Sequence, residues 1–464
     1  MMGGGDDDDM MRMMMIRWIT DDQMLSILML LPVESILSFG MSCKKARRLT
    51  RSNALWKSIC FRDWGITPTQ HQHLLLLLQS SSDSSSSSSD ANNSGGEFDW
   101  NRLYRRLRNL DRVSCFNMIP LDSSPTPRAS HSLNFFKGCL LLFGGGSEGG
   151  RHLDDTWIAY TGNNGFFTRT IHWQRLVSSS SDTPSGRFGH SCVVIGDSLV
   201  LFGGINDSGI RQNDTWVARH HTNALSWTLL DVGPVSPPTR GAHACCSLDN
   251  HTMLIHGGIG LSGMRLGDTW VLHLSDNLSF GTWHQSIAHP SPSPRSGHTL
   301  TYIGSRTVLF GGRGTGYEVL NDVWYFDSSQ PPHFQWVPVL FDLADITGGA
   351  GTSLPRVGHS ATLILGGRVL IYGGEDSYRH RKNDFWLLDI TSSTRLGHDQ
   401  GMLWRRLKCD DGYQPRSRSF HRACADESGC YLYVFGGMVD GVLQPAQPTG
   451  LRFDGELFSV KLLL

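Results

Sequence analysis

The sequence predicts an all-β repeat array preceded by a small all-α module, and three observations lead to this prediction. The 464 residues include 52 glycines and only 18% are charged, which is typical of turn-rich all-β proteins. One pattern of Gly, Arg, His and Trp recurs six times in the later part of the chain. Ahead of Gly65, in contrast, the apolar residues have the spacing of short helices.

The recurring unit is an apolar run that ends in two glycines. The six runs are Leu140–Gly145, Val200–Gly204, Met253–Gly258, Val308–Gly312, Val369–Gly374 and Tyr433–Gly437. An Arg and then a His precede each run: Arg128/His131, Arg187/His190, Arg240/His243, Arg295/His298, Arg356/His359 and Arg418/His421. An Asp and a Trp follow each of the first five: Asp155/Trp157, Asp214/Trp216, Asp268/Trp270, Asp322/Trp324 and Asp384/Trp386. A further Trp comes later in those five units: Trp173, Trp227, Trp283, Trp336 and Trp404.

These features resemble kelch repeats from about Ser124 to the end of the chain, since the Gly pairs are 54 to 63 residues apart. The resemblance implies a six-bladed kelch-type β-propeller whose blades have four strands each. In the second unit we expect strand a at Arg187–Ile195, strand b at Ser198–Phe202, strand c at Asp214–Ala218, and strand d from Trp227. The Gly pair should end strand b with positive φ angles, and the strand-c Trp should wedge between blades.

The sixth unit lacks a strand d of its own. The chain ends soon after Glu456-Leu457-Phe458, which fits strand c, whereas residues 113–121 form an unassigned strand ahead of the first unit. We expect this early strand to complete blade six and to close the ring, which removes exposed sheet edges. The predicted propeller therefore spans residues 112–464.

Residues 17–65 are predicted to form short helices. Thr20 and Gln23 fit a capping box at the first helix, and Pro32 fits the first turn of a second helix that runs to Phe39. Ser42 and Asn53 are candidate caps of a third and a fourth helix, and Gly65 is expected to end the fourth.

The order of Leu31-Pro32, Ser42-Cys43-Lys44, Leu55-Trp56 and Arg62-Asp63-Trp64 resembles an F-box. The resemblance implies binding to a Skp-type adaptor, which docks on a cullin scaffold in a ubiquitin ligase. Ile19-Thr20 stands where the family has Leu-Pro, and Ala46 where it has Trp. A kelch scaffold with a degenerate F-box, or a helical cap without a partner, therefore stays open. The adaptor-binding candidates are Leu25, Leu28, Leu31, Pro32, Ile36, Leu37, Cys43, Lys44, Leu55 and Trp56.

Three other segments lie next to this module. Residues 1–16 are expected to be disordered, and so are residues 66–96, because few apolar residues are distributed along this Ser-rich segment. Residues 97–111 are expected to form a connecting helix with Trp100, Leu103 and Leu107 on one face. Its Arg cluster is interpreted as a solvated face rather than a nucleic-acid site.

The net charge and the cysteine content argue against several classes of function. A net charge of −1 gives no reason to expect nucleic-acid or membrane binding, and ten scattered Cys without a CxxC pair suggest reduced thiols. We therefore expect a protein of the cytoplasm, the nucleus or both. The His residues that recur once per unit are interpreted as structural, so no metal, cofactor or catalytic residue is expected. A propeller enzyme with a metal in the central channel is the alternative.

The loops between strands b and c differ most among the repeats, and they are rich in bases and aromatic residues. We expect this face to hold an acidic or phosphorylated peptide of a target protein. The whole chain is then interpreted as a non-catalytic substrate receptor of an Skp–cullin–F-box ubiquitin ligase. The target-binding candidates are Arg151, His152, Arg211, Arg265, Arg313, Tyr317, Tyr378, Arg379 and Arg381.

Overall fold

The structure is a computed structural model that describes residues 19–82, 98–161, 169–178, 180, 182–221, 224–304, 306–329, 334–341, 354–390, 403–440 and 451–464. The expected disorder of residues 1–16, and of the Ser-rich segment beyond residue 82, lies outside the described residues. The first two residues of the expected helical module, 17 and 18, lie outside them as well.

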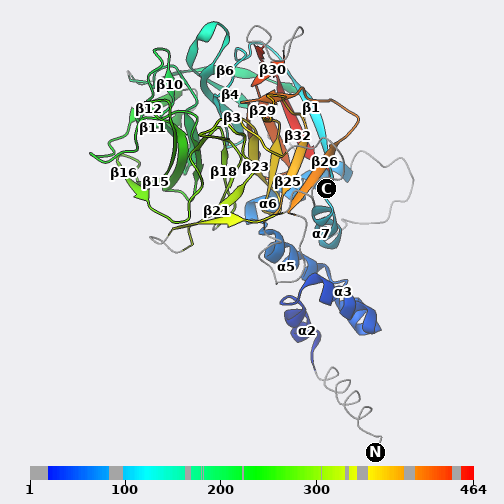
Figure 1. Cartoon of the computed structure of the whole chain (residues 1–464). Coiled ribbons are helices and arrows are strands. Elements are labelled where there is room, and N and C mark those ends of the chain that lie inside the picture. Colours follow the sequence, from blue (N-terminus) through cyan, green and yellow to red (C-terminus); the bar gives the residue numbers. More distant parts are fainter. Residues whose placement is uncertain are drawn as a thin grey trace, which may run out of the picture.

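Six four-stranded antiparallel sheets form a ring, which confirms the six-bladed propeller (Figure 1). Blade one contains β2 Ser132–Phe136, β3 Cys139–Gly146, β4 His152–Tyr160 and β6 Trp173–Ser178. Blade two contains β8 Ser191–Ile195, β9 Ser198–Phe202, β11 Thr215–His221 and β12 Ala224–Leu229. Blade three contains β13 Ala244–Ser247, β14 Thr252–Ile259, β15 Arg265–Leu274 and β16 Gly281–Ser286. Blade four contains β18 Thr299–Tyr302, β19 Arg306–Phe310, β21 Val323–Asp327 and β22 Gln335–Val339. Blade five contains β23 Ser360–Ile364, β24 Arg368–Tyr372, β25 Phe385–Leu388 and β26 Trp404–Cys409. Blade six contains β28 Arg422–Ala425, β29 Tyr431–Phe435, β32 Leu457–Leu462 and β1 Arg112–Pro120.

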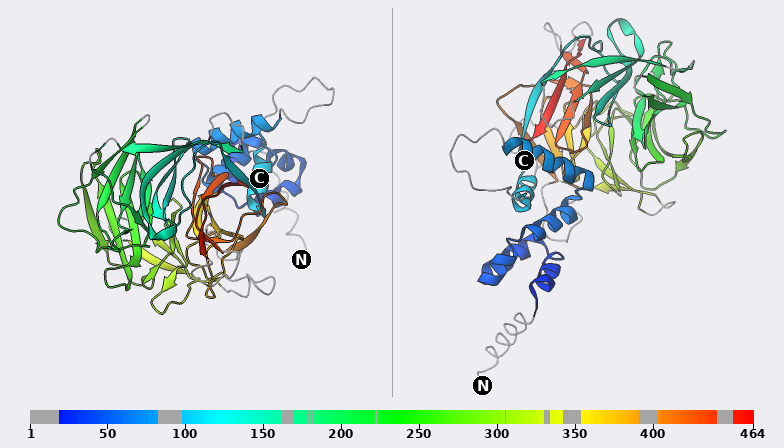
Figure 2. Two further views of the ribbon diagram at one scale, coloured as in Figure 1. Left: turned by 90° about the horizontal axis from the view of Figure 1, so that it is seen from above. Right: turned by 180° about the vertical axis from the view of Figure 1, so that it is seen from behind.

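The blades follow one another around the axis in sequence order (Figure 2, left). Each innermost strand contacts the next, including β28 with β2, so the ring is complete. Strand β1 pairs antiparallel with β32 over Val113–Met118, which confirms that the strand ahead of the first repeat closes blade six. Short strands lie beside the blades, and all but β5 pair with one another in separate small sheets. They are β5 Thr170–Ile171, β7 Arg187–Phe188, β10 Ile205–Asn206, β17 Arg295–Ser296, β20 Arg313–Gly314, β27 Arg418–Ser419, β30 Met438–Asp440 and β31 Leu451–Phe453.

The recurring Arg, Asp and strand-c Trp form one hydrogen-bonded unit in each of the first five blades. In blade one, Arg128 donates to both carboxylate oxygens of Asp155 at 2.6 and 2.9 Å, and to the carbonyl of Gly144 at 3.0 Å. The Trp157 indole donates to the same carboxylate at 2.7 Å. Arg128 is fully buried, and a buried guanidinium needs such complete pairing. In blade six, Arg418 pairs instead with Glu456 and Asp454.

The strand-c Trp packs between blades as expected in three of them, because Trp216, Trp270 and Trp386 each join a buried cluster with residues of the preceding blade. The strand-d Trp is a second wedge that the expectation missed, and it is only 2–3% exposed in all five blades that have it. Trp227, for example, packs with its ring 5.1 Å from that of Phe143 in the preceding blade. The strand-c indole is oriented by its carboxylate partner, and at Trp157 and Trp324 it is less completely covered than the strand-d Trp.

The Gly pair is required because two histidines approach it. A Cβ on Gly204 would lie 2.8 Å from Cβ of His190 in the same blade. A Cβ on Gly203 would lie 3.2 Å from the ring of His243 in the next blade. Both glycines also have positive φ, as predicted, so each blade interlocks with its neighbour through backbone that carries no side chain.

A closed ring of six backbone hydrogen bonds runs around the central axis at the residue that precedes each recurring His. Each N–H donates to the carbonyl of the equivalent residue one blade earlier, at distances of 2.6–2.9 Å. All six residues have left-handed φ angles between 54° and 68°, which interrupts the single strand a expected for each blade. The ring residues are Ser130, Gly189, Ala242, Gly297, Gly358 and Phe420.

The N-terminal module consists of α2 Asp21–Leu28, α3 Val33–Ser42, α4 Lys44–Leu49 and α5 Asn53–Trp64. The Thr20 capping box and the left-handed Gly65 at the end of α5 are confirmed. Two expected caps differ. Cys43 rather than Ser42 caps α4, and the side chain of Asn53 instead holds Phe98 and Trp100 at 2.6 and 3.0 Å.

The expectation of a disordered loop at residues 66–96 is wrong for its first half, where α6 Pro68–Ser82 forms. A capping box explains this, because the Thr67 hydroxyl accepts from the Gln70 N–H and the Gln70 side chain accepts from the Thr67 N–H. Pro68 occupies the first helical position, which favours a helix start. The expected connecting helix is α7 Trp100–Arg108, whose buried Trp100, Leu103 and Leu107 join the core of the module.

We predict that Gly358→Ala destabilises the propeller more than Gly263→Ala does. Both glycines have left-handed φ angles, but only a Cβ on Gly358 meets a neighbour, the Phe420 ring at 2.9 Å. Left-handed backbone costs an alanine about 1–2 kcal/mol, and overpacking adds about 1–3 kcal/mol. Urea unfolding of the two variants measures the difference, and equal losses of stability would refute a special role for the ring.

A second prediction concerns pH. Burial lowers the pKa of His243, His256 and His359 to about 3, whereas an unfolded His titrates near 6.5. Below about pH 6.5 the unfolded chain therefore binds protons that the folded chain does not, and stability falls as the pH decreases. Each such His contributes a slope of at most about 1.4 kcal/mol per pH unit. Above pH 7 these groups contribute no pH dependence.

His256 offers a variant for this test, because Phe stands at its position in four other blades, for example Phe202. The free energy of unfolding should fall less steeply with decreasing pH in His256→Phe than in the unchanged protein. Between pH 7 and pH 5 we expect the slope to decrease by at most about 1.4 kcal/mol per pH unit, the contribution of one His. His251→Gln is the control, because that side chain is half exposed. An unchanged slope for His256→Phe in chemical denaturation would contradict the prediction.

Candidate protein-interaction surfaces

The helical module and the b–c loops lie on opposite faces of the propeller (Figure 1). Leu365 and Cys430, in the a–b turns of blades five and six, share one hydrophobic core with the helices. Successive loops of an antiparallel sheet emerge at alternate ends, so the b–c loops point away from that core. The molecule therefore presents two separate candidate surfaces.

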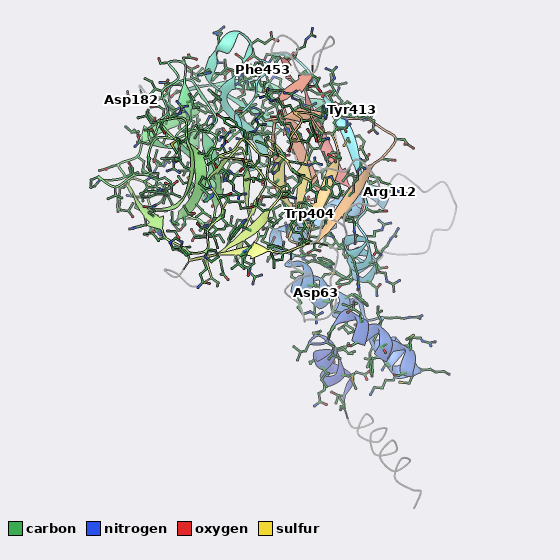
Figure 3. The ribbon with its side chains drawn as sticks, in the orientation of Figure 1. Asp63, Arg112, Asp182, Trp404, Tyr413 and Phe453 are labelled. Atoms are coloured by element: carbon green, nitrogen blue, oxygen red, sulfur yellow. The ribbon has the colours of Figure 1, made fainter. Side chains whose placement is uncertain are left out.

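The module is anchored to the propeller by buried aromatic contacts. The Trp64 ring lies against Gly366 and beneath the guanidinium of Arg368, 5.0 Å from the ring centre. Arg368 is 2% exposed, and burial lowers its pKa to about 10. Figure 3 labels Asp63 at this junction, where it accepts a hydrogen bond from the Tyr104 hydroxyl at 3.0 Å. Helices α5 and α7 are thus fixed to each other and to blade five.

Four large apolar side chains of α2, α3 and the intervening turn are exposed. Leu30 is 83% exposed and Met41 77%, while Ile27 and Leu37 are close to half exposed. We call these four side chains the apolar patch. Helices α2 and α3 extend away from the propeller, so the propeller does not cover the patch (Figure 2, right).

The predicted adaptor-binding residues differ in exposure. Pro32, Leu37, Cys43 and Lys44 are exposed, and Leu25 and Leu31 are partly buried. The other four lie inside the core of the module: Leu28, Ile36, Leu55 and Trp56. Ile27, Leu30 and Met41 are missing from the predicted set, because helical spacing alone does not show which side of a short helix its neighbours cover. Ala46 is also fully buried, so the Trp that it replaces would face inward in this arrangement.

On the opposite face, the structure brings some of the predicted target-binding residues together. The guanidinium of Arg265 lies 4.6 Å from the ring centre of Tyr317, which is 72% exposed and comes from the next blade. Tyr378 is 81% exposed, and its neighbour Arg379 is also exposed. We call these two pairs on the b–c loops of blades three to five, Arg265 with Tyr317 and Tyr378 with Arg379, the basic aromatic cluster.

Two further predicted residues are engaged within the propeller. Arg313 donates to Glu375 at 2.8 Å, and Arg381 pairs with both Glu375 and Asp440. Arg381 is only 8% exposed. This chain of ion pairs links blades four, five and six, so Arg313 and Arg381 stabilise the face rather than offer free charges.

The remaining candidates lie on blades one and two. Arg151 is exposed, whereas His152 is held by Asp207, whose carboxylate accepts from the His152 backbone at 2.6 Å. The ring of His152 also packs on Phe188, with the ring centres 4.6 Å apart. Arg211 is partly buried and donates to the carbonyl of Gly209 at 3.4 Å. Only Arg151 of these three is fully available.

Two other features are absent from the described residues. Within them, no group of three or more His, Cys, Asp or Glu side chains is placed to hold a metal ion. None of the helices in the described ranges is both long and apolar enough to cross a membrane.

Comparison with known proteins agrees with this architecture. A family model described as the KLHDC2/KLHL20/DRC7 Kelch-repeats domain matches residues 91–277 and 212–342. The F-box/kelch-repeat protein At1g51550 of Arabidopsis thaliana is 51% identical over 463 residues, which cover 96% of this chain and 92% of that protein. Putative adagio-like protein 2 of Oryza sativa subsp. japonica is 27% identical, and the match covers 94% of this chain but 65% of that protein.

A solved structure titled "Structure of YjhT" has a TM-score of 0.50 at 14% identity and covers 73% of this chain and 95% of its own, which supports the propeller fold alone. The ring of six blades, the helical module packed beneath it and the near full-length similarity to an F-box/kelch-repeat protein lead to one conclusion. This chain belongs to the F-box/kelch-repeat family.

Proposed function

We propose that this protein is the substrate receptor of an Skp–cullin–F-box ubiquitin ligase in the cytoplasm, the nucleus or both. The observation that carries the proposal is the apolar patch on a helical module that is packed firmly against the propeller, opposite the basic aromatic cluster. Such an arrangement holds a target and an adaptor at a fixed separation. The receptor itself breaks no bond, and its contribution is proximity between a target lysine and the ubiquitin carrier.

The apolar patch suits a helical adaptor. Exposed aliphatic side chains on short helices are the usual partners of an apolar groove. Leu30 and Leu37 reach the surface without entering the core of the module, so burying them would favour binding at little cost in folding. Lys44 and Cys43 are exposed at the start of α4 and extend the same module with polar contacts.

The second candidate is a scaffold that assembles partners without ubiquitination. It was suggested by Ala46, which stands where the F-box pattern has Trp. Because Ala46 is buried within the module, its substitution changes the packing of the helices and leaves the apolar patch in place. This supports the receptor over the scaffold, and adaptor affinity separates the two.

The adaptor test uses Leu30→Asp combined with Leu37→Asp in the full chain. Placing two carboxylates in an apolar interface should weaken binding to a purified Skp-type adaptor at least tenfold. Leu340→Asp is the matched control, because Leu340 is 91% exposed on blade four. Calorimetry or pull-down measures the affinity. Absence of binding by the unchanged protein, or equal binding by the double variant, would overturn the proposal in favour of the scaffold.

For the target, we propose an acidic or phosphorylated peptide held on the b–c face. Arg379 and Arg265 supply positive charge beside two exposed tyrosines, which suits charge-assisted hydrogen bonds around an aromatic anchor. Arg313 and Arg381 are excluded from this role because their charges are already paired. Arg151 extends the basic surface toward blade one.

The target test incubates the full-length protein with arrays of phosphorylated, acidic and neutral peptides. Peptides selected by the unchanged protein should lose at least tenfold in affinity to the variant Tyr378→Ala with Arg379→Ala. Arg406→Ala, an exposed Arg on strand β26, is the control for loss of charge alone. Selection of neutral peptides, or binding that the double variant retains, would refute the assignment.

A further inference from the structure

The propeller encloses a cavity of about 200 Å³ on its central axis. Its walls are formed by the innermost strands, and each of the six blades contributes residues. The cavity lies close to the ring of backbone hydrogen bonds, because the lining residues begin one to two positions after the ring residues along each strand. A water molecule occupies about 30 Å³ of liquid, so the space is large enough for a polyatomic ligand with several waters.

Five blades place a small residue directly after the recurring His, and blade six places Arg422 there. The small residues are Ser132, Ser191, Ala244, Thr299 and Ser360. Three of their hydroxyls pair with the His of the next blade: Ser191 with His243 at 2.8 Å, Thr299 with His359 at 3.0 Å and Ser360 with His421 at 2.9 Å. Arg422 breaks this pattern and puts a guanidinium into the channel.

Arg422 is held at its base and is free at its tip. Its Nε donates to the backbone carbonyl of His131 in blade one at 2.8 Å, across the junction between the last and the first blade. No described Asp or Glu forms an ion pair with it, unlike the six recurring arginines, each of which pairs with an acid. Arg422 is partly exposed to the channel, and a partly desolvated cation without a counter-charge favours an anion beside it.

The effect of Arg422 on histidines all around the ring indicates that its charge lies near the axis. The positive charge of Arg422 contributes to lowering the pKa of histidines in five blades: His131, His190, His243, His359 and His421. Burial is the larger cause of each shift, so these imidazoles are neutral. Burial raises the pKa of the lining thiols Cys192 and Cys245, which are therefore neutral as well. Among the residues described as lining the cavity, Arg422 is the single charged group.

A second donor lies in the same wall. The Nδ2 atom of Asn134, in the neighbouring blade one, is buried and lies near the Cys192 thiol, a weak acceptor. Asn134 and Arg422 both line the cavity. Hydroxyls of Ser132 and Ser360 are also part of the lining. The lining residues therefore combine one cation with the Asn134 amide and no carboxylate, while the hydroxyls of Ser132 and Ser360 are paired within the protein.

We propose that the central channel binds a small inorganic oxyanion of the phosphate class, held by Arg422 with Asn134 as a second donor. The free edge of a guanidinium donates two parallel hydrogen bonds, which match two oxygens of an oxyanion better than a single halide ion. The bound anion neutralises Arg422 and ties blade six to blade one. The site is distinct from the b–c face, and it does not depend on the proposed receptor function.

Calorimetric titration of the full chain with inorganic phosphate at constant ionic strength tests the site. The unchanged protein should bind one phosphate per chain, and Arg422→Met should weaken binding at least tenfold. Arg422→Lys, which keeps the charge but loses the fork, should fall between them. Arg406→Met, an exposed Arg outside the channel, should bind as the unchanged protein does.

Asn134→Ala is a second variant that keeps the charge and removes one donor, and it should weaken phosphate binding several-fold. Thermal unfolding provides an independent readout, since phosphate should raise the melting temperature of the unchanged protein but not that of Arg422→Met. No saturable binding by the unchanged protein over the millimolar range, or equal binding by Arg422→Met, would overturn the site. Equally strong competition by chloride would overturn its assignment to oxyanions.

Discussion

The structure depends on a closed circle of six backbone hydrogen bonds at its axis. Each bond requires a left-handed residue immediately before the recurring His, and three of the six positions are not glycine: Ser130, Ala242 and Phe420. A non-glycine residue in this conformation costs about 1–2 kcal/mol, so the circle persists because the surrounding blades hold it in place. It also requires a complete ring, since Ser130 in blade one donates to Phe420 in blade six.

The outer parts of each blade are built around this circle by one repeated set of contacts. The recurring Arg joins the start of strand a to the first part of strand c through a carboxylate, and the strand-d Trp fills the space against the preceding blade. Because every blade is held to two neighbours, the propeller is a stiff platform. A stiff platform is what separates the apolar patch on one side from the basic aromatic cluster on the other by a constant distance.

The departures from the repeat are as informative as the repeat itself. Blade six takes its last strand from before the first repeat and replaces the Asp of the other blades with Glu456 and Asp454. It also carries Arg422 where the other blades carry a small residue. Symmetry explains the structural contacts of the ring, so a charged side chain that breaks the symmetry inside the channel needs a different explanation, and an anionic ligand supplies one.

The sequence by itself determined the number of blades, the strands within them, the closing role of β1 and the helical start of the chain. These follow from local patterns, such as the Gly pairs and the Thr20 capping box, whose geometry is set by nearby residues. It also contained the signal for α6 in Thr67 and Gln70, which the Ser-rich composition of the segment obscured.

Only the tertiary structure decided which candidate residues are available for binding. Ile36 and Leu37 are adjacent in the sequence, yet one is fully buried and the other is 44% exposed. Arg379 and Arg381 are two residues apart, yet only Arg381 is paired with acids from its own blade and the next. The position of Arg422 on the axis likewise depends on how six blades converge. Exposure and charge pairing are set by contacts between segments far apart in the chain, which no local pattern contains.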